Sequence, residues 1–350
     1  MNTKPVSGPH LPGSKRVGQI MRKVILALCP AVVWGVFIFG WPALWLLMIT
    51  LTASLVFEAV CLQLKGVPVK AALSDGSAFL TGLLVAMTLP PWAPWWIGVV
   101  GAALAIVLGK QVYGGLGQNV FNPAMLARVA LLISFPIEMT EWVNVQPLFF
   151  GAGFLESFGI SFAGHTVDSV TGATTLGAVK TGFSSGQGLS SILYDYSGFL
   201  AFIGWERGSL GETSSLLLLL GGIRLFKQGV IQWYIPVSVL GSIFLLASVF
   251  NLIDAQHYLS PWAHLNSGAL MLVAFFIATD YVTSPNTPLG QMLFGLGCGV
   301  LTFVIRTWGS YPEGTGFAVL LMNACTPLID HYIRPRIYGR YRNGKPLDIN

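Results

Sequence analysis

A short polar run in the middle of the chain carries the residue types that a covalent attachment to threonine requires. It reads Asp168-Ser-Val-Thr171-Gly172-Ala173-Thr174. Glycine, alanine and small hydroxyl residues leave the backbone loose and the side chains small, so an external enzyme can thread the run and present one threonine hydroxyl to a reactive phosphate. Asp168, six residues before Thr174, is placed to help position a metal ion for that transfer. The run therefore predicts a phosphoester on a threonine side chain.

The spacing Asp-x-x-Ser/Thr-Gly-Ala-Thr resembles the acceptor sequence of the flavin transferases that join FMN to threonine through a phosphoester. The last threonine of that pattern is the acceptor, so the resemblance implies a covalent FMN on Thr174. The neighbouring hydroxyl of Thr175 is out of register with the pattern. Because Thr, Ser and Gly also crowd ordinary surface loops, the motif alone leaves open a solvent loop without any chemistry.

The composition is that of a polytopic membrane protein. Of the 350 residues 54% are hydrophobic and only 9% are charged, and the mean hydropathy is +0.69. Soluble domains carry about 25% charged residues. The net charge of +5 comes from short Lys and Arg clusters beside apolar runs, where positive residues set orientation in a membrane. No basic stripe with interleaved aromatic residues is present, so we expect contact with lipid and no nucleic-acid partner.

Cysteine and histidine residues show no spacing typical of metal or cluster ligands. The four cysteines fall within apolar segments without a C-x-x-C pair, and we expect small buried hydrophobes rather than disulfides or iron-sulfur ligands: Cys29, Cys61, Cys298 and Cys325. The five histidines are scattered: His10, His165, His257, His264 and His331. A Gly-rich dinucleotide fingerprint is missing as well. The sequence therefore predicts no metal site, no nicotinamide site and no catalytic residues in this chain.

Hydropathy predicts five membrane crossings in the first half. They cover residues 24–41, 43–64, 77–89, 95–109 and 126–135, and the third stops at Pro90-Pro91. The basic segment 1–23 is expected in the cytoplasm by the positive-inside rule. Five crossings then place the connector, residues 136–213, on the periplasmic side. There the loop of Thr174 faces the compartment in which the bacterial flavin transferase of this motif works.

The second half repeats the first in the opposite orientation. The stretch from Ser77 to Thr88 resembles that from Ser267 to Thr279, and the glycine-rich residues 114–124 resemble 309–318. The predicted crossings of residues 214–330 cover 214–223, 230–250, 265–279, 290–305 and 316–329, and the basic tail 331–350 returns to the cytoplasm. An odd number of spans inverts the second copy. We therefore predict an all-α membrane protein with about ten transmembrane helices, arranged as two inverted five-helix repeats (24–135 and 214–330) with short or broken helices.

Ionisable residues near or inside the predicted spans are candidates for ion coupling. These are Glu58, Asp75 and Asp280. Charges inside a membrane are rare and are functional candidates by default, but buried ion pairs that only hold helices together have the same appearance in sequence. Both interpretations stay open for each of the three carboxylates.

A turn rich in Gly and Asn opens the fifth predicted span. Asn122 is a good N-cap and Pro123 suits the first helical position, so the helix would aim free N–H groups at whatever lies before it. Asn119, Asn122 and Arg128 are therefore candidates to line a second flavin, with the inverted counterpart around Glu313. A tightly packed loop without a ligand is the alternative.

Four further stretches, together with the attachment motif, carry a resemblance to a known family. They are KQVYGGLGQNVFNPAM (110–125), LLISFP (131–136), GSYPEG (309–314) and PLIDHYIRPRIYG (327–339). Across nearly its whole length the chain resembles the D subunits of the bacterial Rnf (or Rsx) complexes, which are ion-translocating ferredoxin:NAD oxidoreductases. The B subunit of the sodium-pumping NADH:quinone reductase is a relative, but it usually carries a longer N-terminal extension.

The resemblance implies an electron-relay subunit in the bacterial inner membrane. Its cofactors would be the covalent FMN on Thr174 and a non-covalent riboflavin within the helical bundle. Its partners would be the other Rnf subunits (A, B, C, E and G) and a flavin transferase for maturation. The resemblance leaves open whether the coupled ion is Na⁺ or H⁺. A subunit of a sodium-pumping quinone reductase, or a channel or carrier without redox chemistry, are the alternatives, because a fold alone does not fix a function.

Overall fold

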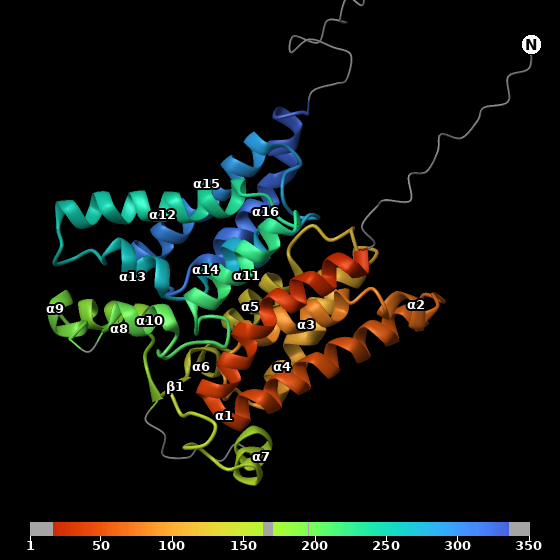
Figure 1. The fold of residues 1–350 in the computed structure, drawn as a ribbon, viewed down its shortest axis with the longest axis horizontal. Helices are drawn as coiled ribbons and strands as arrows, with labels where there is room; N and C mark the ends of the chain where they lie inside the picture. The colour runs from red at the N-terminus through yellow and green to blue at the C-terminus, as the bar shows by residue number, and fades with distance from the viewer. Residues whose placement is uncertain (1–16, 164–170, 195, 336–350) are drawn as a thin grey trace, which may run out of the picture.

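The computed structural model describes residues 17–163, 171–194 and 196–335, and these residues are mostly helical (Figure 1). In the first half the chain enters through α1 and ends in α5. The bounds are α1 Val17–Leu64, α2 Val69–Leu73, α3 Ser77–Thr88, α4 Trp95–Ala103, the π-helix η1 Leu104–Gln111 and α5 Pro123–Ser134. Apart from the earlier start of α1 and α5, these agree with the predicted crossings.

The long helix α1 folds back on itself at Gly40. Its φ of 74° lies in the left-handed region that only glycine adopts without strain, and Pro42 follows two residues later. The indole of Trp92 closes the turn by donating to the carbonyl of Phe39 at 2.9 Å. The two limbs of α1 in Figure 1 cover the residues of the first two predicted crossings, 24–41 and 43–64.

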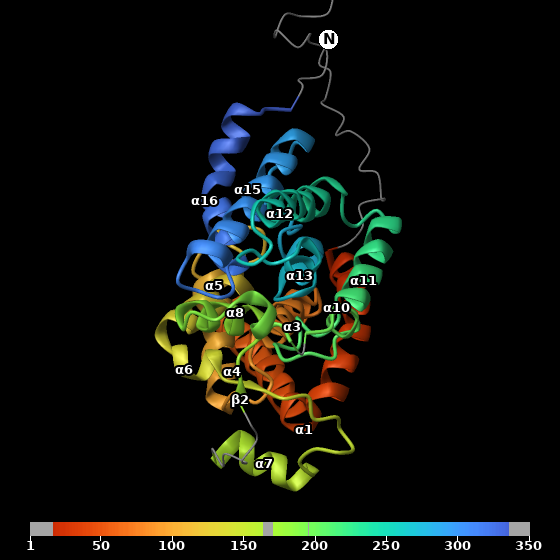
Figure 2. The same ribbon diagram turned by 90° about the vertical axis from the view of Figure 1, so that its left-hand side faces the viewer.

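The connector between the halves consists of short elements. They are α6 Pro136–Thr140, β1 Trp142–Val143, α7 Phe154–Ala163, β2 Thr171–Gly172, α8 Thr175–Ser184, α9 Leu189–Ile192 and α10 Gly198–Ile203. The antiparallel pair β1–β2 is an exception to the predicted all-helical fold. Figures 1 and 2 place α7 at one end of the molecule, away from the start of α1 and the end of α16.

The second half contains one interrupted helix among longer ones. Its bounds are α11 Ser215–Lys227, α12 Tyr234–Ile253, α13 Pro261–Asn266, α14 Leu270–Leu272, the π-helix η2 Val273–Ile277, α15 Pro288–Trp308 and α16 Thr315–Tyr332. The break between α13 and α14 lies at Gly268, whose φ is 71°. The span predicted as continuous over residues 265–279 is therefore split near its beginning.

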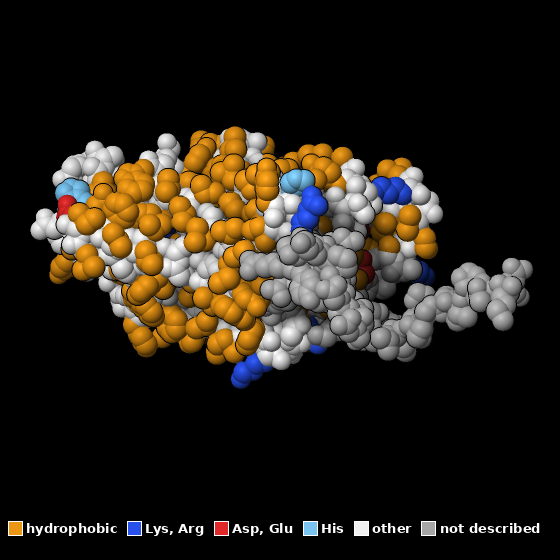
Figure 3. Space-filling view, turned by 90° about the horizontal axis from the view of Figure 1, so that it is seen from above, with side chains coloured by type: hydrophobic (Ala, Val, Ile, Leu, Met, Phe, Trp, Pro, Cys, Tyr) orange, Lys and Arg blue, Asp and Glu red, His pale blue; other side chains and the backbone are white. Residues whose placement is uncertain are grey.

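Both halves contribute to a single main hydrophobic cluster. Leu28 and Met87 come from the first half and Leu270 and Phe294 from the second, and all four are fully buried. Three of the described helices, α1, α12 and α15, are long and apolar enough to cross a membrane, and α3, α4 with η1, and α5 are shorter apolar helices. Hydrophobic side chains also cover much of the face in Figure 3. These features define a multi-pass membrane protein.

The expected burial of the cysteines was wrong for two of them. Cys298 is buried and Cys61 is half-buried, but Cys29 and Cys325 are exposed on the outside of their helices. The outward face of a membrane helix is as apolar as the inward face, so hydropathy does not separate lipid-facing from core positions. All four cysteines are free thiols.

Candidate functional site

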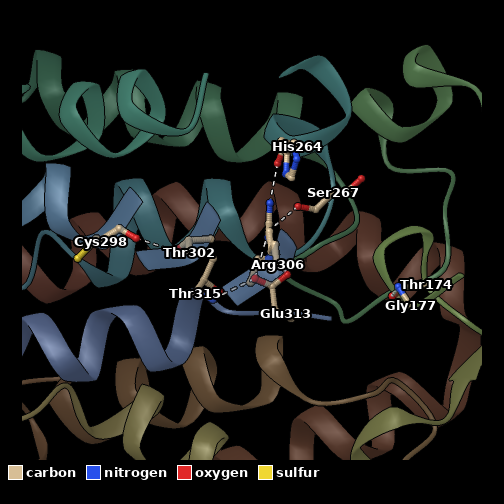
Figure 4. Close-up of polar contacts among 10 residues, drawn as sticks. Thr174, Gly177, His264, Ser267, Cys298, Thr302, Arg306, Glu313 and Thr315 are labelled. Atoms are coloured by element: carbon tan, nitrogen blue, oxygen red, sulfur yellow. Dashed lines mark hydrogen bonds and ion pairs between the residues drawn. The ribbon is translucent and has the colours of Figure 1, made fainter. Parts of the chain in front are cut away.

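The predicted acceptor Thr174 is the N-cap of helix α8. Its Oγ1 accepts a hydrogen bond from the backbone N–H of Gly177 at 3.2 Å, as Figure 4 shows, and α8 continues for ten residues. The helix starts here because a threonine side chain satisfies one of the N–H groups that a first turn leaves free. Of the predicted motif, Asp168 lies outside the described residues.

The residues before Thr174 form the short ladder β1–β2. Gly172 pairs with Trp142, and Thr171 pairs with Val143. The guanidinium of Arg207 lies directly against Gly172, where the Cβ of any other residue would overlap it. The motif glycine therefore lies against the end of a flexible, exposed side chain, and its φ is not positive.

Residues 205–213 form a loop, called here the charged loop, that carries Glu206 and Arg207 to the attachment motif. Gly204, with a φ of 100°, turns the chain sharply after α10. The other end is anchored by the fully buried Leu210 and by Gly211, whose N–H donates to the carbonyl of Met87 at 2.6 Å. The loop is thus held against the kink of α1 and the end of α3.

Glu206 accepts a hydrogen bond from the hydroxyl of Thr175, the residue next to the predicted acceptor. Burial raises the pKa of the Glu206 carboxyl, and the hydrogen bond from Thr175 opposes part of that rise. The two adjacent threonines therefore differ in environment. The Thr175 hydroxyl is a donor to a carboxylate, whereas that of Thr174 accepts from the first turn of α8.

Helix α8 is attached to the second half through Lys180. Its Nζ donates to the carbonyl of Ile305 at 3.2 Å and also to that of Gly309, at the C-terminal end of α15. The end of a helix carries free carbonyls and partial negative charge, which favour a cation there. Burial lowers the pKa of the Lys180 amine.

A cluster around Arg306 lies next to the contact of Lys180 with Ile305 and Gly309. Figure 4 shows the side chains of this cluster. The side chain of Arg306 pairs with Glu313 at 3.1 Å and donates to the carbonyls of His264 at 2.7 Å and Ser267 at 2.8 Å. Glu313 in turn accepts from the N–H groups of Ala269 and Thr315. The cluster therefore binds the break between α13 and α14 to the start of α16.

Arg128 lies between the connector and this cluster. Its guanidinium is 5.7 Å from the ring centroid of Trp142 and faces a small cavity that Glu212 and Glu313 also line. One guanidinium nitrogen, NH1, has no hydrogen-bond partner among the described residues. Burial, and next the carboxylate of Glu313, raise the pKa of Glu212 in the connector. Trp142 contacts Arg128 and pairs with Gly172, so this residue connects Arg128 to the attachment motif.

A larger cavity of about 370 Å³ lies at the opposite end, between the two halves. Its walls are mainly apolar, and the polar residues on them include Asn119, Asn122, Lys110 and Asp280. The structure thus brings together Asn119 and Asn122, as predicted for a ligand, and adds Asp280. Arg128 is not among the residues that line this cavity and lies in the other cluster.

Asn122 connects three elements at this cavity. Its Oδ1 caps α5 by accepting from Ala124 N and Met125 N at 3.1 and 3.2 Å, and its backbone N–H donates to Oδ1 of Asn323 on α16. The amide nitrogen of its side chain donates to the carbonyl of Ile277 in η2. The predicted cap is confirmed, and it also joins the first half to the second.

The three predicted coupling carboxylates have different surroundings. Glu58 is buried and pairs with Lys110 at 2.8 Å. Asp75 accepts from the backbone N–H and the hydroxyl of Ser77, both at 2.7 Å, and so fixes the start of α3. Asp280 lines the large cavity and accepts from Val282 N and Thr283 Oγ1, with no cation within ion-pair distance among the described residues.

Sequence reasoning missed Glu206, Arg207 and Lys180. The adjacent charges of Glu206 and Arg207 follow the apolar run 198–205, and this pair of charges was a usable signal. Lys180 follows the motif by six residues but gave no indication of its partners, which are more than a hundred residues away in the chain.

Helices with apolar outer faces and polar clusters between two halves define a multi-pass membrane protein. Its candidate site is the predicted acceptor motif in the connector between the halves. The model of the NQR2, RnfD, RnfE family matches residues 5–339, and the chain belongs to this family. It is 54% identical to the D subunit of the ion-translocating oxidoreductase complex of Halorhodospira halophila over 99% of this chain and 98% of the relative. The protein of the same name from Stutzerimonas stutzeri is 53% identical over 95% and 94%, and that from Rhodobacter capsulatus is 45% identical over 89% and 87%.

Proposed function

We propose that the chain is the membrane electron-relay subunit of an Rnf-type ion-translocating oxidoreductase complex and carries a covalent FMN on Thr174. The observation that carries the proposal is the position of the acceptor motif. Its last threonine begins a helix on the connector, and this helix is attached through Lys180 to the end of α15 in the second half. The names of the relatives, which match nearly the whole chain, support membership in such a complex.

The surroundings of Thr174 fit a phosphoester. The first N–H groups of α8 point out of its N-terminus, and this end of a helix favours a negatively charged phosphate. Gly172 leaves room for the guanidinium of Arg207, whose donors suit phosphate oxygens. A bound flavin supplies the capacity to accept and release electrons, and the chain supplies its position.

The large cavity is the proposed place of the second, non-covalent flavin, riboflavin. A volume of about 370 Å³ with apolar walls suits a flat aromatic ring, and ligand sites of this kind contain a few polar groups that fix orientation. Asn119, Asn122 and Asp280 offer donors and acceptors for such a ring, and Lys110 lies at the same wall. Arg128 does not line this cavity and would lie instead between the large cavity and the attachment motif.

The proposed topology has ten spans in two inverted repeats, 24–135 and 214–330. Two similar clusters at corresponding positions support it: Lys110 contacts Ser77 at the start of α3, and Arg306 contacts Ser267 before α14. Lys and Arg residues near the start of α1 and in the turn after it favour a cytoplasmic location for both termini, in segments 1–23 and 331–350. The connector 136–213 is then periplasmic.

The proposed setting is the bacterial inner membrane, with the other Rnf subunits (A, B, C, E and G) as partners and a flavin transferase for maturation. The chain would relay electrons between NADH and ferredoxin carriers held by those partners, coupled to Na⁺ or H⁺ movement, without a nicotinamide site of its own. Among the coupling candidates, the contacts favour Asp280, which lines the large cavity, because Glu58 is paired with Lys110 and Asp75 is engaged in fixing the start of α3.

The test is the mass and fluorescence of the subunit purified from its native host. We expect the intact chain to carry the added mass of one FMN and the denatured band to fluoresce. Thr174→Ala should lose both, whereas Thr174→Ser, which keeps an acceptor hydroxyl and the cap of α8, should retain a part. Flavin that persists in Thr174→Ala would disprove the attachment site. An unmodified native chain would favour a channel or carrier without redox chemistry.

A further inference from the structure

We propose that the charged loop selects the flavin acceptor. Glu206 excludes Thr175, and Arg207 holds the phosphate at Thr174. The inference rests on the proposed function, since it concerns the choice between two adjacent threonines of the same motif. That choice needs a physical cause because both hydroxyls lie at the start of α8 and belong to the same residue type.

Glu206 makes Thr175 a poor acceptor because its carboxylate lies directly beside the hydroxyl. The hydroxyl of Thr175 donates to the Glu206 carboxyl, so a phosphate that reaches this oxygen must also approach the carboxylate. Two negative groups at this distance repel each other. Thr174 has no such neighbour among the described residues, and its oxygen contacts only an N–H of the helix.

Arg207 provides the opposite charge on the other side of the motif. Its guanidinium lies against the Cα of Gly172, two residues before Thr174, and the side chain is exposed. It forms no ion pair with any carboxylate of the described residues, so its donors remain available. A guanidinium binds phosphate oxygens through two parallel hydrogen bonds. Glu206 therefore places a negative charge beside Thr175, and its neighbour Arg207 places a positive charge beside Gly172, on the other side of Thr174.

The transfer that these residues would direct is a substitution at phosphorus. The Oγ of threonine attacks the flavin-side phosphorus of a flavin dinucleotide, and a P–O bond to threonine forms. The bond between this phosphorus and the bridging oxygen of the pyrophosphate breaks, and the nucleoside monophosphate leaves. The hydroxyl proton passes to solvent base, and nothing is oxidised or reduced. Arg207 would neutralise the phosphate that remains on the chain.

The experiment compares variants of the full chain expressed with the flavin transferase, with peptide mass spectrometry to locate the flavin. Thr174→Ala alone should carry no detectable flavin on Thr175. Thr174→Ala/Glu206→Ala should carry flavin on Thr175 at about tenfold or more above the detection limit, because the carboxylate that repels the phosphate is removed. Arg207→Gln should slow the modification of Thr174 about tenfold, with partial rescue in Arg207→Lys. Arg224→Gln, at the other end of the molecule in α11, is the matched control.

The single variant Glu206→Ala verifies folding, because a folded loop still accepts flavin on Thr174. The proposal is overturned if Thr175 stays unmodified in the double variant or if Arg207→Gln matures at the native rate, since the transferase alone would then set the register. A native chain without any flavin would overturn the proposed function as well. Modified native protein with unchanged variants would overturn only this inference.

Discussion

Nζ of Lys110 lies 2.8 Å from Oε1 of Glu58, and the two side chains are 2% and 6% exposed. The same amine donates to the hydroxyl of Ser77 at 2.7 Å, where α3 begins. Arg306 has a similar position in the second half, where it pairs with Glu313 and donates to the backbone carbonyl of Ser267 before α14. A cation that pairs with a carboxylate thus fixes the start of a short helix in each half.

Removing only one member of the Lys110–Glu58 pair should destabilise the protein strongly. Lys110→Met leaves a buried carboxylate without its cation, which costs about 3–5 kcal/mol in comparable pairs. We expect a large fall in the thermal unfolding midpoint of the purified protein in detergent. The double variant Lys110→Met/Glu58→Gln should recover much of the loss, because neither charge is then left unpaired. If the single and double variants unfold at the same temperature, the pairing of Lys110 with Glu58 makes no contribution to the stability of the protein.

Local patterns predicted the elements better than they predicted the partners. The cap of α5 is confirmed because Asn122 and Pro123 act within one turn, and the end of α3 before Pro90 follows from the same local chemistry. The partner of Glu58 lies 52 residues away, at a distance where no sequence pattern applies. The outward position of Cys29 could not be predicted, because lipid-facing and core positions of a membrane helix carry the same apolar side chains. The contact of Glu206 with Thr175 could not be predicted either, because the two residues lie far apart in the chain.

The Glu206 carboxyl should make the stability of the connector depend on pH. Its pKa in the folded protein is raised by burial above the ordinary value of 4.5, so the folded state binds the proton more tightly than the unfolded state. Stability is therefore greatest below pH 4.5 and decreases as the pH rises through the folded pKa. Glu206→Gln keeps an acceptor for Thr175 but has no charge. The midpoints of the two proteins should converge at low pH, and the variant should become the more stable one as the pH rises.

Asn122 should retain the non-covalent flavin of the large cavity. Asn122→Ala removes the cap of α5, at about 1 kcal/mol, together with the amide donor to Ile277. We expect less flavin released on denaturation and unchanged FMN on Thr174, both measured by chromatography. Asn122→Asp keeps the capping oxygen and is the matched control for the helix start. Equal release from Asn122→Ala and the native protein would place the second flavin elsewhere.

Lys180 should hold helix α8, and the acceptor at its start, against the end of α15. Its amine is the donor to the carbonyls of Ile305 and Gly309, and these acceptors lose their partner in Lys180→Met, whose side chain has a similar length. Hydrogen exchange at the amides of α8 should accelerate about tenfold, which corresponds to one charge-assisted hydrogen bond. Lys227→Met, in the last turn of α11, is a control for the loss of a positive charge.

The effect of Lys180→Met on α8 should also depend on pH. Because burial already lowers the pKa of Lys180, the acceleration should be smaller at high pH, where the native amine loses its proton and its attraction to the helix end. An α8 that exchanges at the native rate in Lys180→Met would mean that the hydrophobic contacts of Leu176 and Val179 hold the helix without this link.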